Sequence, residues 1–370
     1  MSTVLAERML VIERPGVATV HEGPPSEGPT EGEFEACTVY SGLSAGTELS
    51  FLRGSNPFLA GRWDAESGLF RADQPGLSYP VTRLGYMEVA RVGDSRTPVV
   101  PSGALVAMAY GHRSRYLGNP MVDRVVPLPD DVDPLLGIYV AHMGPICANG
   151  LLHAAAELHG TDVRSLADGV RGRHIVVTGA GVVGLLTALF ARRHGAACVV
   201  VIDPTEQRRA AAAALGFETV DPVSADPAPT LKAHWRHGPA DRGADVVFQC
   251  RGQAATLGLA LRLLRPQGTV IDLAFHQSGA DALRLGEEFH HNGLTLRSAQ
   301  IGRVPRGLAH YWDRERLSTE TLDLLRTDGP AIRKHLVTDV LSLAEAPALL
   351  ADLDIHRKHV LQAVFTFESS

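Results

Sequence analysis

Three glycines, Gly179, Gly181 and Gly184, have the spacing G-x-G-x-x-G, which can bind phosphate. They follow the apolar, β-branched run from His174 to Thr178 and precede helix-forming residues from Leu185 to Arg193. Between a strand and a helix, the first glycine permits a tight turn, the second lets the backbone approach a pyrophosphate, and the third allows close packing. Free N–H groups and the dipole at the helix start attract phosphate. The motif therefore predicts a dinucleotide site.

An acidic residue stands at the end of the next strand. This strand runs from Cys198 to Ile202 and is followed by Asp203, at the distance from the glycines expected of a residue that accepts hydrogen bonds from the adenosine ribose 2′-hydroxyl. Because a carboxylate would repel a 2′-phosphate, the sequence predicts NAD(H) in preference to NADP(H). Arg208, one helical turn further on, either flanks the same ribose or is a solvated helix charge.

The elements around this motif alternate. Strand and helix patterns succeed one another from residue 174 to 273, which predicts a doubly wound α/β domain with a parallel sheet. Before about residue 130, short β-rich runs punctuated by Gly and Pro indicate a β-barrel-like domain, and residues 133–158 have helical periodicity. Residues 303–370 show a mixture of helix-like and strand-like patterns and end with a strand-like run at 360–367.

Composition excludes several classes of protein. The length of 370 residues favours two domains, and a net charge of -6 with scattered Lys and Arg argues against nucleic acid as a partner. Charges at Glu7, Arg8 and Glu13 interrupt the N-terminal apolar residues, so we expect no signal peptide, no membrane partner and a cytoplasmic location. The cysteines form no C-x-x-C pair and are expected to be small buried hydrophobes; they are Cys37, Cys147, Cys198 and Cys250.

Four stretches resemble the medium-chain dehydrogenase/reductase superfamily, in which a Rossmann domain interrupts a GroES-like β-barrel catalytic domain. They are S-G-L-S-A-G-T-E at 41–48, L-G-Y-M-E at 84–88, D-V-V-F-Q-C-R-G at 245–252 and L-L-R-P-Q-G-T-V at 263–270. The resemblance implies a catalytic domain from residues 1–148 and 304–370, an NAD(H)-binding domain from 149–303, and a homodimer or homotetramer. The first stretch is most similar to the subgroup containing bacteriochlorophyllide dehydrogenase, which oxidises a secondary alcohol on a large ring.

The sequence departs from this resemblance at the catalytic metal. Zinc alcohol dehydrogenases of the superfamily bind zinc through a Cys in the first motif and the His and Glu of a G-H-E motif, where this chain has Ser44, Tyr86 and Met87. Residues 144–146, the region of the remaining ligand, offer no donor side chain, and 110–116 replaces the four-cysteine zinc lobe. We therefore expect a zinc-independent member without a metal site.

Without zinc, hydrogen-bond donors or a general acid/base must act on the substrate oxygen. Tyr86 is the first candidate, since a phenol can donate to a carbonyl or take a proton from an alcohol; the alternative is a residue of the barrel core. Ser44 and Thr47 come next, with Glu48, which is either a buried base or a structural carboxylate that ties the loop. His142 is either a proton relay or a satisfied core residue.

The resemblance implies further contacts to the cofactor. Asn149 stands where the family commonly has a Thr touching the nicotinamide carboxamide, and residues 273–275 should lie along the nicotinamide. The complete predicted cofactor set is Gly179, Gly181, Val182, Val183, Gly184, Asp203, Arg208, Asn149, Leu273, Ala274 and Phe275.

An aromatic segment with interspersed charges, residues 51–80, lies between the two N-terminal motifs. It is either a lid or substrate wall, or a dimer contact or packed loop. As a wall, it implies a substrate larger than ethanol that carries polar groups.

The leading hypothesis is NAD(H)-dependent interconversion of a secondary alcohol and a ketone on a bulky, cyclic small molecule of specialised metabolism. Zinc-free superfamily members often reduce an activated C=C bond, which stays open as a second reading. A third reading is a non-catalytic NAD(H) sensor or structural relative.

Overall fold

The chain folds into two compact units in a computed structural model that describes residues 7–24, 27–74, 76–281 and 283–367. One unit comprises residues 1–142 and 337–370, and the other comprises 143–336. The expected domain boundaries, at 148/149 and 303/304, differ from this division. Two helices account for the difference, because α3 (Met143–His159) and α8 (Arg314–His335) pack on each other and α8 also contacts α4 (Val182–Arg193).

The unit of residues 143–336 is built on a parallel sheet. Its strands are β10 (His174–Thr178), β11 (Cys198–Ile202), β12 (Glu218–Val220), β15 (Ala244–Gln249), β16 (Leu264–Asp272) and β17 (Thr295–Ser298). They pair in the order β12-β11-β10-β15-β16-β17, which is the doubly wound order 3-2-1-4-5-6 of dinucleotide-binding domains. The predicted Rossmann fold is confirmed, and the order of the strands reverses between β10 and β15, next to the glycine motif that follows β10.

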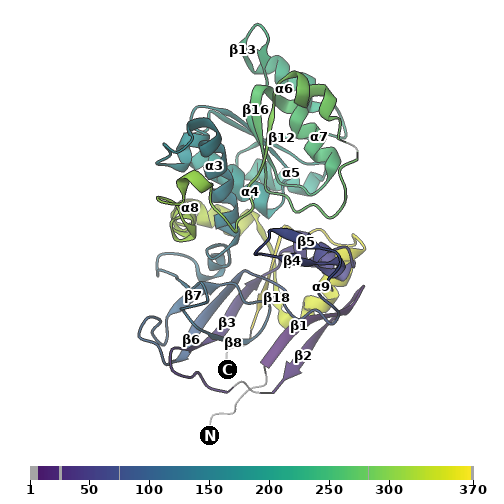
Figure 1. Ribbon diagram of the computed structural model, residues 1–370. Helices are drawn as coiled ribbons and strands as arrows, with labels where there is room; N and C mark the ends of the chain where they lie inside the picture. The colour runs from purple at the N-terminus through teal and green to yellow at the C-terminus, as the bar shows by residue number, and fades with distance from the viewer. Residues whose placement is uncertain (1–6, 25–26, 75, 282, 368–370) are drawn as a thin grey trace. The chain divides into compact units, whose positions relative to one another are not determined.

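Helices cover both faces of this sheet. The remaining ones are α5 (Glu206–Ala214), α6 (Pro227–His234) and α7 (Ala254–Leu263). Figure 1 shows the sheet between α3, α4 and α8 on one side and α6 and α7 on the other. Because both faces are covered, the interiors of the central strands are buried, as at Ile175–Val177, and the sequences of these strands are apolar runs without alternation.

The other unit is a mixed sheet completed by the C-terminal segment. Its strands are β3 (Phe34–Gly42), β6 (Glu88–Ser95), β7 (Leu105–Met108), β8 (Arg115–Gly118), β9 (Val126–Pro127), β18 (Val337–Ser342) and β19 (Gln362–Thr366). They pair as β18-β19-β3-β6-β7-β9, with β8 also on β3. Antiparallel pairing of β19 with β3 brings residues near the two ends of the sequence together, as expected of the GroES-like domain.

Smaller elements surround this sheet. They are the hairpin of β1 (Glu7–Arg14) and β2 (Val17–Gly23), the hairpin of β4 (Arg62–Asp64) and β5 (Leu69–Arg71), and the helices α1 (Ala45–Leu52), α2 (Pro57–Ala60) and α9 (Ala346–Asp354). Residues of α1, α9 and β19 form one apolar cluster with the β1 strand, including Leu52, Leu350 and Phe365. This cluster anchors the start of α1, which carries several of the predicted catalytic residues.

Two predictions from the sequence concern membrane spans and the N-terminal segment. None of the described helices combines the length and apolarity needed to cross a membrane. The prediction about the N-terminal segment falls partly on residues 1–6, which lie outside the described residues.

All four cysteines are free thiols, and burial raises the pKa of the Cys147 thiol to about 12, so this residue behaves as a small hydrophobe.

Candidate active site

The glycine motif has the geometry that its spacing predicts. Gly179 has a φ of +100°, which favours glycine, and a Cβ added at Gly184 would overlap the carbonyl oxygen of Gly179. Gly181 is the N-cap of α4, makes no side-chain cap and has open space where a Cβ would stand. The first turn of α4, which includes Val182 and Val183, therefore presents its N–H groups beside open space.

Asp203 lies directly against this motif. Its Oδ2 accepts a hydrogen bond from the N–H of Ala180 at 2.9 Å, and its Oδ1 accepts one from the N–H of Thr205 at 2.8 Å. The side chain is fully buried, and Arg208 Nη1 lies 3.9 Å from Oδ2. The carboxylate thus fixes the first strand, the glycine turn and the second strand to one another.

Sequence reasoning missed Arg209, the neighbour of Arg208. Its Nη1 donates to the carbonyl oxygen of Asp203 at 2.8 Å, and its Nη2 lies 3.2 Å from Asp221 Oδ2. Two consecutive arginines in a helix look alike in sequence. Only the position of β12, which ends just before Asp221, shows which of them holds the end of β11.

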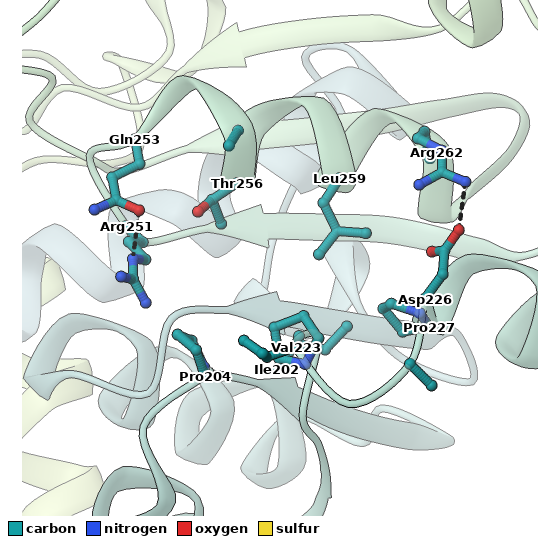
Figure 2. Close-up of a pocket in the computed structure, with 13 residues that line it drawn as sticks. Ile202, Pro204, Val223, Asp226, Pro227, Arg251, Gln253, Thr256, Leu259 and Arg262 are labelled. Carbon is teal, nitrogen blue, oxygen red and sulfur yellow. Dashed lines mark hydrogen bonds and ion pairs between the residues drawn. The ribbon is translucent and has the colours of Figure 1, made fainter. Parts of the chain in front are cut away.

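A cavity of about 520 Å³ begins beside Asp203, because Ile202 and Pro204 both line it. Figure 2 shows Thr256 and Leu259 of α7 facing these residues and Val223 across the cavity. Charged and polar side chains mark its two ends. Arg251 Nε donates to Gln253 Oε1 at 3.0 Å at one end, and Arg262 Nη2 pairs with Asp226 Oδ2 at 2.6 Å at the other (Figure 2).

Asn149 is fully buried in α3 and makes contacts that the sequence did not predict. Its Nδ2 points at the carbonyl oxygens of residues 299, 300 and 303, at 3.3–3.4 Å. Within the described part of the chain, its buried Oδ1 has no hydrogen-bond partner. Asn149 therefore holds the loop after β17, and its contact with the carboxamide stays a prediction.

The segment after β16 also belongs to this unit. The N–H of Leu273 donates to the carbonyl of Gln249 at 2.9 Å, and the N–H of Ala274 donates to Asp272 Oδ1 at 3.0 Å. Phe275 is exposed. The backbone is therefore held at the carboxyl edge of the sheet, where ligands of open α/β sheets bind, and its contact with nicotinamide stays a prediction.

Three predicted catalytic residues come together in the unit of residues 1–142 and 337–370. The hydroxyls of Ser44 and Tyr86 are hydrogen-bonded to each other, and the Tyr86 ring meets the His142 ring edge-on with centroids 4.7 Å apart. Ser44 is the N-cap residue of α1, yet its hydroxyl caps no helix N–H. Thr47 lies in the first turn of α1, half-buried, and its N–H donates to the Ser44 carbonyl at 3.0 Å.

Glu48 is buried and holds two partners. Its Oε1 accepts from the N–H of Ser44 at 2.7 Å, and its Oε2 lies 2.6 Å from His112 Nε2. Of the two readings left open for Glu48, this geometry is that of a structural carboxylate that ties the loop.

The chain of buried hydrogen bonds continues beyond His112. Its Nδ1 lies 2.6 Å from Ser41 Oγ, which donates to Glu88 Oε1 at 2.9 Å. Burial disfavours the charged imidazole, but the charges of Glu48 and Glu88 outweigh it, so the pKa of His112 is raised. Burial also raises the pKa of the Glu88 carboxyl. Sequence reasoning missed His112, Ser41 and Glu88. The signal that the sequence offered was Glu88, an acidic residue at the start of strand β6 next to apolar residues.

The side chains at the superfamily's catalytic zinc positions do not fit zinc. Ser44 and Tyr86 offer paired hydroxyls, and Met87 offers a buried thioether that packs against Gly42. Gly144 packs against Thr321 and brings no donor. Zinc sites use thiolate, imidazole and carboxylate ligands, and the nearby Glu48 is already paired with His112.

Comparison with known proteins identifies the relatives of this chain. Residues 182–316 match the family model of zinc-binding dehydrogenases. D-guloside 3-dehydrogenase of Escherichia coli K12 is 25% identical over 331 residues, covering 87% of this chain and 89% of that protein. The chain is an oxidoreductase whose sequence is similar to those of zinc-binding dehydrogenases.

Solved structures of dehydrogenases share the fold over nearly the whole length of this chain. A zinc-binding dehydrogenase of Sinorhizobium meliloti bound to NADP has a TM-score of 0.72 at 19% identity, covering 98% of this chain and 99% of that one. An Escherichia coli CFT073 protein, described as a short chain alcohol dehydrogenase in complex with NADH, has a TM-score of 0.73 at 14% identity, covering 98% and 99%. These identities establish the shared fold.

Proposed function

We propose that the protein is a zinc-independent, NAD(H)-dependent oxidoreductase that interconverts a secondary alcohol and a ketone on a bulky, cyclic small molecule such as those of specialised metabolism. The paired hydroxyls of Ser44 and Tyr86, at positions where zinc relatives have metal ligands, carry this proposal. The relative that oxidises a D-guloside supports a secondary alcohol on a ring as the substrate class. The likeness of residues 41–48 to the bacteriochlorophyllide dehydrogenase subgroup points to the same chemistry, in a homodimer or homotetramer.

The residues of the Rossmann unit suit a dinucleotide. The start of α4 has uncapped N–H groups for a pyrophosphate, and the cavity between Leu259 and Val223 is apolar enough for an adenine ring. Asp203 already accepts two backbone hydrogen bonds, and each of its oxygens has a further lone pair for a ribose hydroxyl. A bound nicotinamide would supply or accept the hydride. The crystallised neighbours with NADP and with NADH support this class of cofactor.

The paired hydroxyls would handle the proton and the charge on the substrate oxygen. Tyr86 would donate to a carbonyl oxygen during reduction and take the hydroxyl proton during oxidation. Ser44 would keep the phenol oriented, and the edge contact with His142 would restrict rotation of the ring. Hydrogen-bond donors aimed at an oxygen that gains charge lower the barrier without a metal.

The exposed aromatic hairpin β4–β5 suits a bulky substrate. Trp63 and Phe70 face each other with ring centroids 5.8 Å apart, and both are about half exposed. Phe58 of α2 adds a third ring, 5.3 Å from Phe70. We propose that these rings form a wall for the substrate, as sugar rings and other cyclic molecules pack well on aromatic faces.

The proposal predicts that Tyr86→Phe slows turnover while NADH still binds. Loss of the phenolic proton should lower kcat about 100-fold or more, the usual size of a general acid/base contribution, with NADH affinity within about twofold. The measurement is NADH formation from a panel of methyl glycosides and cyclic secondary alcohols, with and without a chelator. Tyr116→Phe, which removes a phenol bonded to Asp123 in the same unit, is the control.

Unchanged turnover of Tyr86→Phe would remove this residue from the mechanism. Loss of turnover in the chelator with NADH affinity and the circular dichroism spectrum unchanged, restored by zinc, would contradict a zinc-independent reaction. Turnover of enones without any turnover of alcohols or ketones would replace the proposed reaction by C=C reduction.

The ribose assignment predicts that Asp203→Ala weakens NADH binding about 10- to 100-fold, the cost of losing hydrogen bonds to a charged group. NADPH binding should fall less, because the repulsion of the 2′-phosphate is lost as well. Fluorescence titration with both cofactors measures this, and Glu206→Ala, which removes an exposed acid three residues on, is the control. Equal losses for NADH and NADPH would refute discrimination by Asp203 and leave it a structural residue of the loop.

A further inference from the structure

A cluster of two histidines and an aspartate lies at the end of the Rossmann sheet opposite the glycine motif. His174 begins β10 and Asp245 is near the start of the adjacent parallel strand β15, whereas the glycine turn follows the end of β10. His237 reaches the same place from the hairpin of β13 (Arg236–Gly238) and β14 (Asp241–Arg242). One ligand atom from each of the three residues lies within 4.8 Å of the other two.

The donor atoms are held in place and have lone pairs to offer. His174 Nδ1 is buried, lies 3.9 Å from Asp245 Oδ2 and has no hydrogen-bond partner in the described part of the chain. His237 Nε2 lies 3.1 Å from the carbonyl oxygen of Gly243. When Nε2 donates its proton there, Nδ1 keeps a lone pair, and a carbonyl partner of this kind typically orients a metal-binding imidazole. The ring of Trp235 stacks on His174, 5.0 Å between centroids, and restricts its rotation.

The Asp245 carboxylate is held in place by its partners. The guanidinium of Arg265 pairs with Asp241 and, at 2.6 Å, with Asp245 Oδ1. The same contact fixes the Asp245 carboxylate, whose other oxygen accepts from the N–H of His174 at 2.8 Å.

We infer that His174, His237 and Asp245 bind one divalent transition-metal ion of the zinc class. Two imidazoles and a carboxylate are ligands of the type that zinc uses, with water in the fourth position. An ion bound at about 2.0–2.1 Å from each ligand would draw the three donors closer together, with the exposed hairpin moving. The ion would fasten the β13–β14 hairpin to the sheet. This position lies in the Rossmann unit and is separate from the residues that replace the superfamily's catalytic zinc ligands.

The test is calorimetric titration of the metal-free full chain with Zn²⁺, together with the visible absorption of the Co²⁺ form. We expect one Zn²⁺ per chain, a Co²⁺ spectrum of tetrahedral type, and an affinity at least 10-fold weaker in His237→Ala, since losing a ligand costs no less than losing its orienting partner. His174→Ala and Asp245→Asn should weaken binding at least as much. His234→Ala removes an exposed histidine three residues from His237 and should bind Zn²⁺ like the wild type.

Circular dichroism of each variant separates loss of the site from loss of the fold. His237 is exposed in a hairpin, so its substitution should leave the spectrum unchanged, and His237→Gln repeats the experiment with a side chain of similar length. Absence of saturable Zn²⁺ binding by the wild type would overturn the inference. So would equal Zn²⁺ affinity of the wild type and the two folded His237 variants.

Discussion

Replacing Gly184 by alanine is expected to abolish dinucleotide binding and to destabilise the Rossmann unit, whereas Gly181→Ala should abolish binding alone. A Cβ at Gly184 would overlap the carbonyl oxygen of Gly179, so the glycine turn or the start of α4 must move. Overpacking of this kind costs about 3 kcal/mol or more when backbone atoms are involved. A Cβ at Gly181 meets nothing within 4 Å and strains no backbone angle, but it would stand where a pyrophosphate approaches the start of α4.

Two measurements separate these effects. Urea unfolding should show a lower midpoint for Gly184→Ala and an unchanged one for Gly181→Ala, while NADH titration should show at least 100-fold weaker binding for both. Gly286→Ala, at another open position, is the control for both measurements. Tight NADH binding by Gly181→Ala would mean that the cofactor does not approach the helix there, and an unchanged midpoint for Gly184→Ala would contradict the packing argument.

The second large effect is expected for His112→Ala. This change leaves the buried carboxylate of Glu48, together with Glu88, without the imidazole between them. Breaking a buried charge pair by removing one partner typically costs about 3–5 kcal/mol, because the remaining charge is uncompensated. The free energy of unfolding measured with denaturant should therefore fall by this amount. His21→Ala, which breaks an exposed pair with Glu13 in the same unit, should lower the free energy of unfolding far less, because solvent screens that pair.

The same pair predicts how stability depends on pH. The pKa of His112 is raised in the folded protein. The contribution of this residue to the free energy of unfolding is therefore fully present below the pKa of the unfolded state, about 6.5, and is lost as pH rises through the pKa of the folded state. The raised pKa of Glu88 also makes the folded protein less stable as pH rises. This loss begins at a lower pH, because the pKa of an unfolded glutamate is lower than that of a histidine. Stability of the wild type should fall between neutral and alkaline pH. In His112→Gln this fall should be smaller, and an identical pH profile would show that His112 does not titrate.

Local sequence signals were sufficient for the nucleotide-binding core. The strand predicted at 174–178 is β10, and the helix-forming residues 185–193 lie within α4 and end with it. These elements follow from short-range rules, since β-branched runs favour strands and only glycine fits the turn at Gly179. The fold class could be read from their alternation for the same reason.

Helix α8 escaped prediction because its sequence carries local signals against a helix. It contains Gly329 and Pro330, and Ser and Thr residues lie in its first half. Its apolar residues Leu317, Leu324 and Ile332 are nevertheless buried in the Rossmann unit, where α8 packs against α3. Tertiary packing outweighed the weak intrinsic propensity, and this helix also moved the division between the units away from the expected boundary.

By itself, then, the sequence determined the glycine turn, its flanking elements and the acid at the end of the second strand, because each depends on backbone preferences within a few residues. Only the tertiary structure decided what the remaining polar groups do. Glu48 and His112 are 64 residues apart and meet through the pairing of distant strands, and His237 reaches His174 through a hairpin between α6 and β15. A charge pair or a metal cluster depends on the path of the chain, and no local pattern encodes that path.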